Sequence, residues 1–461
     1  MEKMKKLLAL LLSVVMCVTC LAACGNGGNA GGNGDSDVNA DGEVVIEWWI
    51  SYATEKETLL QKLVDDFNTL HDGEYEVKVV YAGGYPEIRA KLDSTKDAKN
   101  LPGIVAGQPV VNAYYASIDS IVPIQEFIDK DEEDWTNGTY ETVKTAYSDR
   151  DGKLIGWPVG VSSAGWFVNV DLLKKAGYTT ADMTSYEKIA QIATAVASKG
   201  VAEYGIAYYY TGMDLYDAIT LQGCDFVDND NGMSKDATKS VITEGDTNKA
   251  LKSFLSATAK LYEKNYAYTY QANTDNDIMP AFVDGKIAIM GATNSYTHKL
   301  MFLNPEFDWE FVPNTVATEA GQYKGYALCE GAGNYIVDNG NEKIMQGSYE
   351  FIKFLAKVEN QTYWCTNTGY IPYTDEAFAD EAYQTWMKEN LPEAEKMQTT
   401  LKAIPKELRG PYLGLAEDIQ AACRNMIGVL AVDPDSDLDE LIEEYAMSID
   451  EAIEIDAIRK K

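Results

Sequence analysis

Val44-Val-Ile-Glu-Trp-Trp-Ile50 is a short run of apolar and aromatic residues that predicts a β-strand. Apolar residues then recur every three or four positions from Leu59 to Leu70, which is typical of an amphipathic helix. Thr54-Glu-Lys-Glu57 precedes this helix and has the pattern of a capping box. Apolar and polar residues alternate from Tyr75 to Tyr81, as in a half-buried strand. Together these residues predict a β-α-β unit and therefore an α/β fold.

The loops that follow the two strands are the first places to expect a ligand. In an open α/β sheet the ligand lies at the carboxyl ends of the strands. Ser51 and Tyr52 follow the first strand, and Gly83-Gly84-Tyr85 follows the second. We therefore predict ligand contacts at Ser51, Tyr52 and Tyr85.

The beginning of the chain has the pattern of a secretory signal. Lysines in residues 1–6 precede the apolar run Leu7–Val18, and Leu21-Ala22-Ala23-Cys24 is similar to a bacterial lipobox. We predict a signal peptide over residues 1–23, acylation of Cys24, and a tether over residues 24–42, which are rich in glycine and asparagine. An ordinary signal peptide with an incidental cysteine is the alternative.

Composition limits the classes of partner. The chain has 461 residues, of which 46% are hydrophobic, so it is long enough for two packed domains. Its net charge of −33 argues against nucleic acid or an anionic membrane as a binding surface, since both are polyanions. Four cysteines beyond the signal region are scattered singly, which predicts neither a disulfide scaffold nor a zinc site, although a disulfide stays open. These cysteines are Cys224, Cys329, Cys365 and Cys423.

A partial match to a calcium-binding loop runs from Asp433 to Glu444. Calcium loops of this kind need a glycine at the sixth position, where this chain has Leu438. A loop that leads into a helix capped by Asp437 explains the same residues. We favour that helix cap and predict no metal and no cofactor.

Four later segments resemble one protein family in their order and spacing. They are Trp166-Phe-Val-Asn-Val-Asp-Leu-Leu-Lys-Lys-Ala-Gly177, Phe282-Val-Asp-Gly-Lys-Ile-Ala-Ile-Met290, Phe351-Ile-Lys-Phe-Leu355 and Thr368-Gly-Tyr-Ile-Pro372. The family is the extracellular solute-binding proteins of carbohydrate-type ABC importers. The resemblance covers nearly all of residues 43–430, and within the family it is strongest to the glycerol-3-phosphate-binding branch.

The resemblance implies a fold like that of type II periplasmic binding proteins: two α/β lobes, a hinge and a ligand cleft between the lobes. It places residues 43–161 with 293–337 in the first lobe and residues 162–292 with 338–461 in the second. It also implies a monomer that closes on a small-molecule solute and delivers it to the membrane subunits of an ABC permease. Such a protein is not an enzyme.

Only some of the branch's ligand-binding positions have matching residue types in this chain. Glu330 stands where the branch has a small apolar residue, and Tyr412 stands where it has a phosphate-binding arginine, although Arg409 is nearby. Among Tyr208, Tyr209 and Tyr210, strand alternation leads us to choose Tyr209. The complete set of predicted ligand contacts is Ser51, Tyr52, Tyr85, Ser162, Ser163, Tyr209, Asn294, Ser295, Glu330, Gly331, Tyr370 and Tyr412.

The departures favour a sugar over a phosphate. Phosphate recognition uses arginine forks or a strongly positive site, and this chain has lost the arginine and gained Glu330. Aromatic rings cover the apolar faces of a sugar while carboxylates and amides pair with its hydroxyls, and the chain has 30 tyrosines. A glycerol-3-phosphate or glycerophosphodiester ligand is the alternative. An exported glycoside hydrolase with paired carboxylates and a sensor subunit are rival functions.

Overall fold

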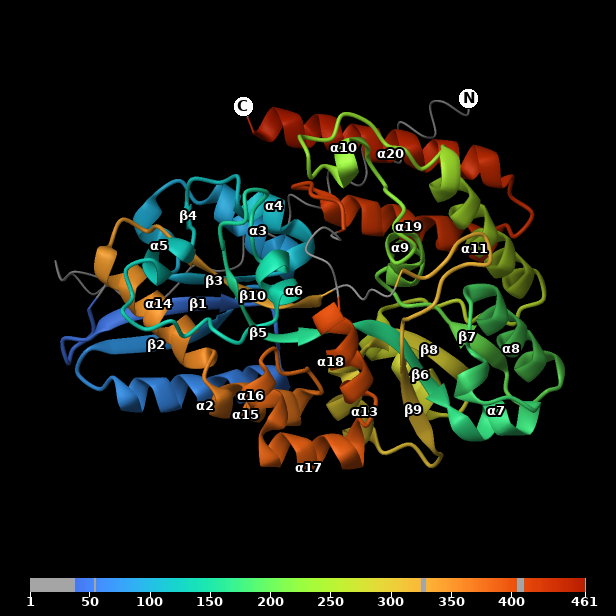
Figure 1. The fold of residues 1–461 in the computed structure, drawn as a ribbon, viewed down its shortest axis with the longest axis horizontal. Helices are drawn as coiled ribbons and strands as arrows, with labels where there is room; N and C mark the ends of the chain where they lie inside the picture. Colours follow the sequence, from blue (N-terminus) through green and yellow to red (C-terminus); the bar gives the residue numbers. More distant parts are fainter. Residues whose placement is uncertain (1–37, 54, 325–328, 404–409, 461) are drawn as a thin grey trace, which may run out of the picture.

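The computed structural model describes residues 38–53, 55–324, 329–403 and 410–460. The predicted lipobox with Cys24, Thr54 of the capping box and Arg409 lie outside these residues. The described chain forms two sheets, each covered by helices, which lie in separate halves of the molecule (Figure 1). The half with the first sheet is called the first lobe below, and the other half is called the second lobe.

The predicted β-α-β unit is confirmed and forms the centre of the first lobe. Strand β1 (Val44–Ile50) pairs in parallel with β2 (Tyr75–Tyr81), and α2 (Glu55–Leu70) connects them. Strand β3 (Ile104–Gly107) extends the sheet on the other side of β1, and β10 (Glu330–Val337) joins it antiparallel. Strands β4 (Ile121–Val122) and β5 (Trp157–Ser162) both pair with β10. Burial alternates along β1, so Trp48 enters the core while Trp49 stays partly exposed.

The second sheet has the strand order β7-β8-β6-β9. Strand β6 (Ala164–Asn169) pairs antiparallel with both β8 (Ile287–Thr293) and β9 (Trp309–Pro313), and β7 (Tyr204–Ala207) is parallel to β8. Helix α7 (Val170–Ala176) follows β6 and ends at Gly177 in the left-handed conformation, as its sequence predicts. The core of this lobe also includes α8 (Tyr186–Ser198), α9 (Met213–Thr220) and α11 (Gly245–Glu263).

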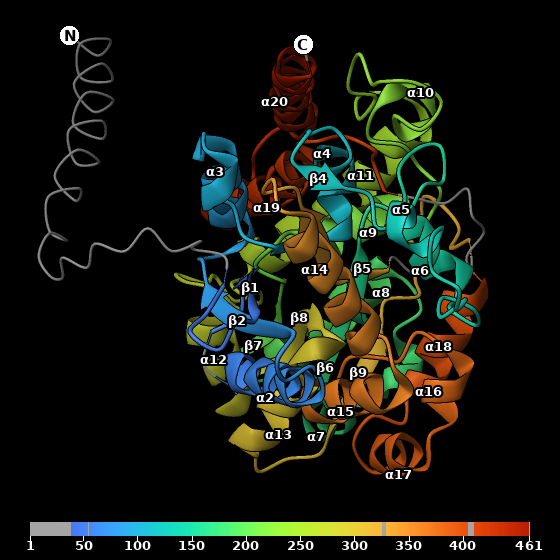
Figure 2. The same ribbon diagram turned by 90° about the vertical axis from the view of Figure 1, so that its left-hand side faces the viewer.

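The division between lobes differs from the prediction in two segments. Helices α14 (Glu342–Leu355) and α15 (Val358–Thr368) were expected in the second lobe, but α14 packs on β1 and α15 packs on β5 and α2. Figure 2 shows α15 beside α2. Conversely, β9 pairs with β6 in the second sheet, although residues 293–337 were expected in the first lobe. The chain therefore passes between the sheets at Ser163, between β9 and β10, and again after α18 (Ala394–Ala403).

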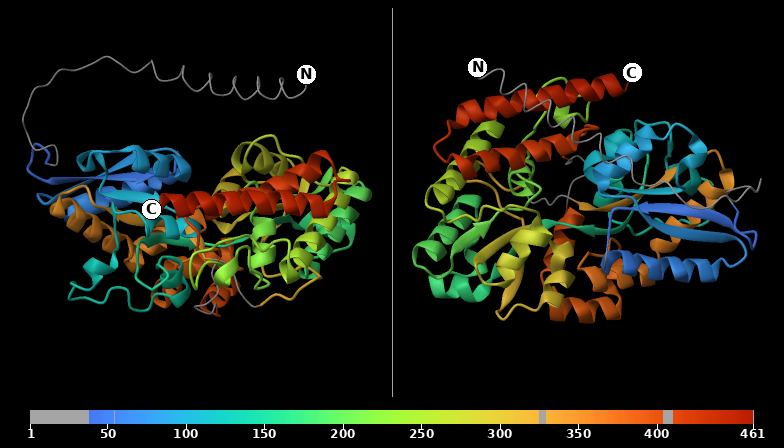
Figure 3. Two further views of the ribbon diagram at one scale, coloured as in Figure 1. Left: turned by 90° about the horizontal axis from the view of Figure 1, so that it is seen from above. Right: turned by 180° about the vertical axis from the view of Figure 1, so that it is seen from behind.

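Two long helices complete the second lobe near the end of the chain. Helix α19 (Ala416–Val432) packs on α9 and α11, and α20 (Leu438–Arg459) packs on α19. Seen from above, α20 lies along the second lobe with its C-terminal end directed toward the first (Figure 3). Asp437 caps α20, because its side chain accepts hydrogen bonds from the backbone N–H groups of Asp439 and Glu440, as the helix-cap interpretation predicts.

The remaining helices are short. They are α3 (Tyr85–Ser94), α4 (Asn112–Tyr115), α5 (Gln125–Ile128), α6 (Glu141–Ala146), α10 (Asp228–Asn231), α12 (Met279–Val283), α13 (Thr297–Leu303), α16 (Asp375–Ala379) and α17 (Glu381–Asn390). Among the described residues, no helix combines the length and apolar character needed to cross a membrane. The cysteines Cys224, Cys329, Cys365 and Cys423 are free.

Candidate functional site

Tyrosines from separate segments meet at the carboxyl ends of β1 and β2. The hydroxyl of Tyr52, just after β1, lies 2.7 Å from the hydroxyl of Tyr370, and the Tyr85 hydroxyl donates to Tyr52 at 3.4 Å. Ser51 lies beside Tyr85. The structure thus brings together four predicted contacts: Ser51, Tyr52, Tyr85 and Tyr370. Of these, Tyr52 and Tyr370 are 318 positions apart in the sequence.

The second sheet contributes the other side of this cluster. Tyr209 follows β7, and its ring lies 6.5 Å from that of Tyr296, centroid to centroid. The Thr293 and Ser295 hydroxyls are 2.7 Å apart at the end of β8. The sequence did not predict Tyr296 as part of the site, although Tyr296 is the residue after the predicted pair Asn294-Ser295. The name tyrosine cluster is used below for Tyr52, Tyr85, Tyr209, Tyr296 and Tyr370.

Glu330 is a buried carboxyl group beside the tyrosine cluster. Its residue is 8% exposed, and burial raises its pKa to about 7. Burial also raises the pKa of Tyr85 and Tyr209, and the charge of Glu330 adds to both shifts, so the carboxyl group lies within electrostatic reach of the two rings. Among the described residues its side chain has no hydrogen-bond partner, so it is available to accept a hydroxyl donor from a solute.

Asn294 has a different environment from the hydroxyl groups around it. Its side chain is fully buried, its Oδ1 accepts the N–H of Ser163 at 2.7 Å, and its Nδ2 donates to the carbonyl of Gly369 at 2.5 Å. Both polar atoms are therefore occupied by backbone groups. Asn294 ties the passage between β5 and β6 to the loop that carries Tyr370.

Ser162 and Gly331 also lie where the two lobes meet. Ser162 ends β5 opposite Glu330 in the register of β5 and β10, and it is buried. Gly331 has a φ of +147°, and a Cβ atom there would lie 2.4 Å from the carbonyl oxygen of Gly160. The glycine is therefore required by the close approach of the two strands, which explains its presence without any ligand.

Tyr412 is placed against a loop outside the tyrosine cluster. The guanidinium of Arg150 lies 5.1 Å from the centre of its ring, and its backbone N–H donates to the carbonyl of Asn231 at 2.9 Å. The structure thus groups Tyr412 with the loop around α10.

Lys56 is the charged residue of the site that the sequence analysis missed. Its Nζ lies 5.1 Å from the ring centre of Tyr52, 5.3 Å from that of Tyr370 and 5.7 Å from that of Tyr296. Burial lowers its pKa to about 8. The pattern alone assigns this residue to the first turn of an amphipathic helix, where lysine is usually solvated.

Contacts between the lobes flank the site. Arg89 of α3 forms a bidentate pair with Glu417 of α19, at 2.8 and 2.5 Å. Arg459, the last residue of α20, donates to the Ser117 hydroxyl at 2.9 Å, and its guanidinium lies 4.8 Å from the ring centre of Tyr114. These contacts join the first lobe to the two C-terminal helices.

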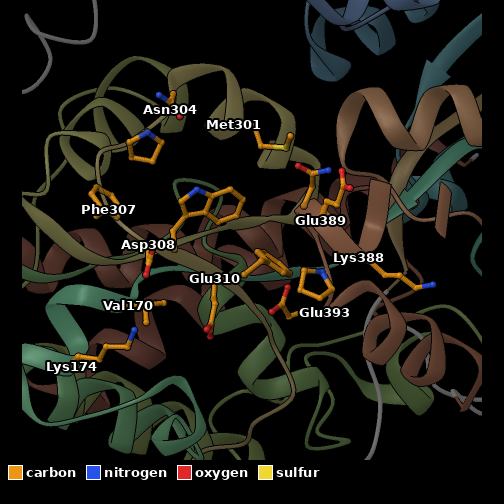
Figure 4. Close-up of a pocket in the computed structure, with 15 residues that line it drawn as sticks. Val170, Lys174, Met301, Asn304, Phe307, Asp308, Glu310, Lys388, Glu389 and Glu393 are labelled. Atoms are coloured by element: carbon orange, nitrogen blue, oxygen red, sulfur yellow. The ribbon is translucent and has the colours of Figure 1, made fainter. Parts of the chain in front are cut away.

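A hollow of about 640 Å³ lies away from the tyrosine cluster and is formed by other residues. Trp309, Phe307 and Glu310 line it from β9 and the loop before it, and Glu393 lines it from the segment between α17 and α18 (Figure 4). No residue of the tyrosine cluster lines this hollow. Across the described chain, no group of three or more His, Cys, Asp or Glu side chains is arranged to hold a metal ion.

Comparison with known proteins identifies the family. The bacterial extracellular solute-binding protein family matches residues 62–392. The sn-glycerol-3-phosphate-binding periplasmic protein UgpB of Shigella flexneri is 23% identical over 344 residues, which are 74% of this chain and 76% of that protein. UgpB of Escherichia coli K12 has the same identity over the same shares of both chains.

Solved structures with the same fold include sugar-binding and glycerophosphodiester-binding proteins. UgpB from Mycobacterium tuberculosis, in complex with glycerophosphocholine, has a TM-score of 0.70 at 17% identity, covering 90% of this chain and 99% of that one. MalE from Xanthomonas citri has a TM-score of 0.68 at 16% identity, covering 89% and 98%. The predicted type II fold and the resemblance to the glycerol-3-phosphate branch are both confirmed. The chain belongs to the family of bacterial extracellular solute-binding proteins of ABC importers.

Proposed function

We propose that this protein is a lipid-anchored, monomeric receptor that captures a sugar or oligosaccharide outside the cell and delivers it to an ABC permease. Family membership supports the role of a receptor. The solute class rests on the tyrosine cluster and Glu330, in which aromatic rings, hydroxyl groups and one buried carboxyl group converge from both lobes.

The chemistry of the cluster suits a hydroxylated solute. Tyrosine rings cover the apolar C–H faces of a sugar, and their hydroxyls both donate and accept hydrogen bonds. Glu330 can accept a bond from a sugar hydroxyl when it is charged, and donate one when it is protonated. Because the contributing residues come from both lobes, a bound solute would favour the arrangement in which the lobes lie together.

The same residues favour binding over catalysis. Retaining and inverting glycosidases place two carboxyl groups on opposite sides of the scissile bond. Asp214, another buried carboxyl group, is already held by the indole N–H of Trp166 at 3.1 Å and by the backbone N–H of Tyr209 at 2.5 Å. Two other carboxyl groups of the second lobe are also held by protein groups: Asp217 accepts the side-chain amide of Asn314 at 3.1 Å, and Asp275 accepts the Tyr296 hydroxyl at 3.2 Å and pairs with Lys299. We therefore assign these carboxyl groups to structure and propose no reaction.

Glycerol-3-phosphate or a glycerophosphodiester is the second candidate solute. It is favoured by the names of the UgpB relatives and by the glycerophosphocholine in the Mycobacterium tuberculosis structure. Both candidates are hydroxylated, so the difference between them is the anionic group.

A thermal-shift screen of residues 25–461 against sugars, oligosaccharides and glycerol phosphates tests the receptor function. A solute at 100 times its Kd should stabilise the protein by about 2.7 kcal/mol. Tyr370→Ala should abolish the shift, whereas Tyr81→Ala, at an exposed tyrosine of β2, should retain it. Turnover of a glycoside by the purified protein, or no shift with any solute, would contradict the proposal.

The membrane anchor is tested separately in cells. Replacement of Cys24 by alanine should release the mature protein from the membrane fraction, and mass spectrometry should find acyl chains on Cys24 of the unaltered protein. An unacylated Cys24 would contradict the anchor and leave the solute-binding proposal intact.

A further inference from the structure

We propose that Lys56 binds the solute directly, and that the solute carries an anionic group, a carboxylate or a phosphate ester, on its hydroxylated frame. This inference rests on the proposed function and narrows the class of solute that the tyrosine cluster receives.

The position of Lys56 places its charge inside the site. It lies in the first turn of α2, immediately after the loop with Ser51 and Tyr52, and three tyrosine rings surround its ammonium group. Aromatic faces attract a cation through their quadrupoles, but they provide no negative charge. The rings therefore hold the ammonium group in place without neutralising it.

The charged groups around Lys56 act on it from a distance and do not form an ion pair with it in the described part of the chain. Glu55 on its own helix and Asp275 attract it, whereas Lys299 of α13 repels it, and Lys56 in turn lowers the pKa of His298. Asp275 is already committed, because it pairs with Lys299 and accepts the Tyr296 hydroxyl at 3.2 Å. Within the described residues Lys56 itself forms no ion pair. The positive end of the α2 dipole adds to the local potential.

The opposite charge of the site, on Glu330, lies within electrostatic reach of Tyr85 and Tyr209. The ammonium group of Lys56 lies over Tyr52, Tyr296 and Tyr370. A solute in the cluster would thus lie within reach of both a carboxyl group and an ammonium group. A solute that carries both hydroxyls and an anion matches these two groups. A lysine is a point charge on a flexible stem, so its ammonium group can donate to a carboxylate as readily as to a phosphate.

Two variants separate the charge of Lys56 from its shape. Lys56→Met keeps an apolar stem over the rings and removes the charge, and Lys56→Arg keeps the charge. Lys62→Met is the matched control, because Lys62 is on the same helix, is largely exposed and pairs with Asp66. Calorimetry at pH 7 measures the Kd for glucuronate, galacturonate, glucose 6-phosphate and glycerol 3-phosphate, with glucose and galactose as neutral counterparts.

We expect the uncharged variant to lose at least tenfold more affinity for the acidic solute than for its neutral counterpart. Lys56→Arg should retain the preference for the acidic solute over its neutral counterpart, and Lys62→Met should stay within threefold for both. Affinity for the acidic solute should fall as salt is added. Uronates and phosphate esters are separate arms, and tighter binding of one identifies the anion.

Equal affinity of the Lys56→Met variant for an acidic solute would overturn the inference, as would a protein that binds neutral sugars alone. Binding of neutral sugars alone would leave the receptor function standing, whereas no binding of any solute would contradict both. The salt dependence is measured on the unaltered protein, so the inference is testable even if the variant fails to fold.

Discussion

Replacing Arg89 with alanine should weaken solute binding by opening the molecule, although no residue of the tyrosine cluster is altered. The bidentate pair between Arg89 and Glu417 joins α3 of the first lobe to α19 of the second, and its side chains are 13% and 21% exposed. An exposed ion pair contributes less than about 1 kcal/mol, and removal of one partner from a buried pair costs about 3–5 kcal/mol. For this partly buried pair we expect a loss of about 2 kcal/mol, between the two limits.

If the pair exists only when the lobes lie together, that loss shifts the equilibrium between closed and open forms by up to about thirtyfold. Titration calorimetry should show a corresponding increase in Kd, and small-angle X-ray scattering should show a larger radius of gyration without solute. Lys153→Ala is the control, because Lys153 pairs with Glu126 inside the first lobe and both are more exposed. A Kd within twofold of the unaltered protein, together with an unchanged radius, would refute this role of the pair.

Three further predictions concern stability. Asn294→Ala should destabilise by about 1–3 kcal/mol in urea unfolding, because it leaves two buried backbone groups unpaired, and an unchanged midpoint would contradict this. Burial raises the pKa of Glu330 to about 7, so the stability that its protonated form provides is present below about pH 4.5 and is lost as the pH rises through 7. Glu330→Gln should therefore flatten the dependence of the free energy of unfolding on pH between about pH 5 and about pH 8. Gly331→Ala should lower the Tm through strain of at least about 1 kcal/mol, whereas Gly428→Ala in α19, where a Cβ meets nothing within 4 Å, should raise it slightly; equal Tm values would count against the strain.

Local patterns predicted local structure well. The apolar and aromatic run at residues 44–50 and the alternation at residues 75–81 predicted the two strands, and Gly177 correctly ended α7. The three consecutive tyrosines 208–210 were expected in a strand, but β7 ends at Ala207. The Tyr208 hydroxyl is hydrogen-bonded to Thr258 in the core of the second lobe, whereas Tyr209 lies beside Tyr296, and its contact with a solute stays a prediction.

Long-range packing was harder to predict. An amphipathic helix must bury one face, but its pattern does not say which sheet covers it, so α14 and α15 were assigned to the wrong lobe. The direction of a long side chain is equally undetermined, which is why Lys56 was missed. Tyr412 was chosen from the resemblance to the glycerol-3-phosphate branch, and its contact with a solute stays a prediction.

A crystal structure of residues 25–461 with the best solute from the screen tests the central claim most directly. We predict the solute among Tyr52, Tyr209 and Tyr370, with a hydroxyl on Glu330 and an anionic group on Lys56. A solute bound instead in the hollow beside Trp309, with the tyrosine cluster unchanged, would contradict the account (Figure 4).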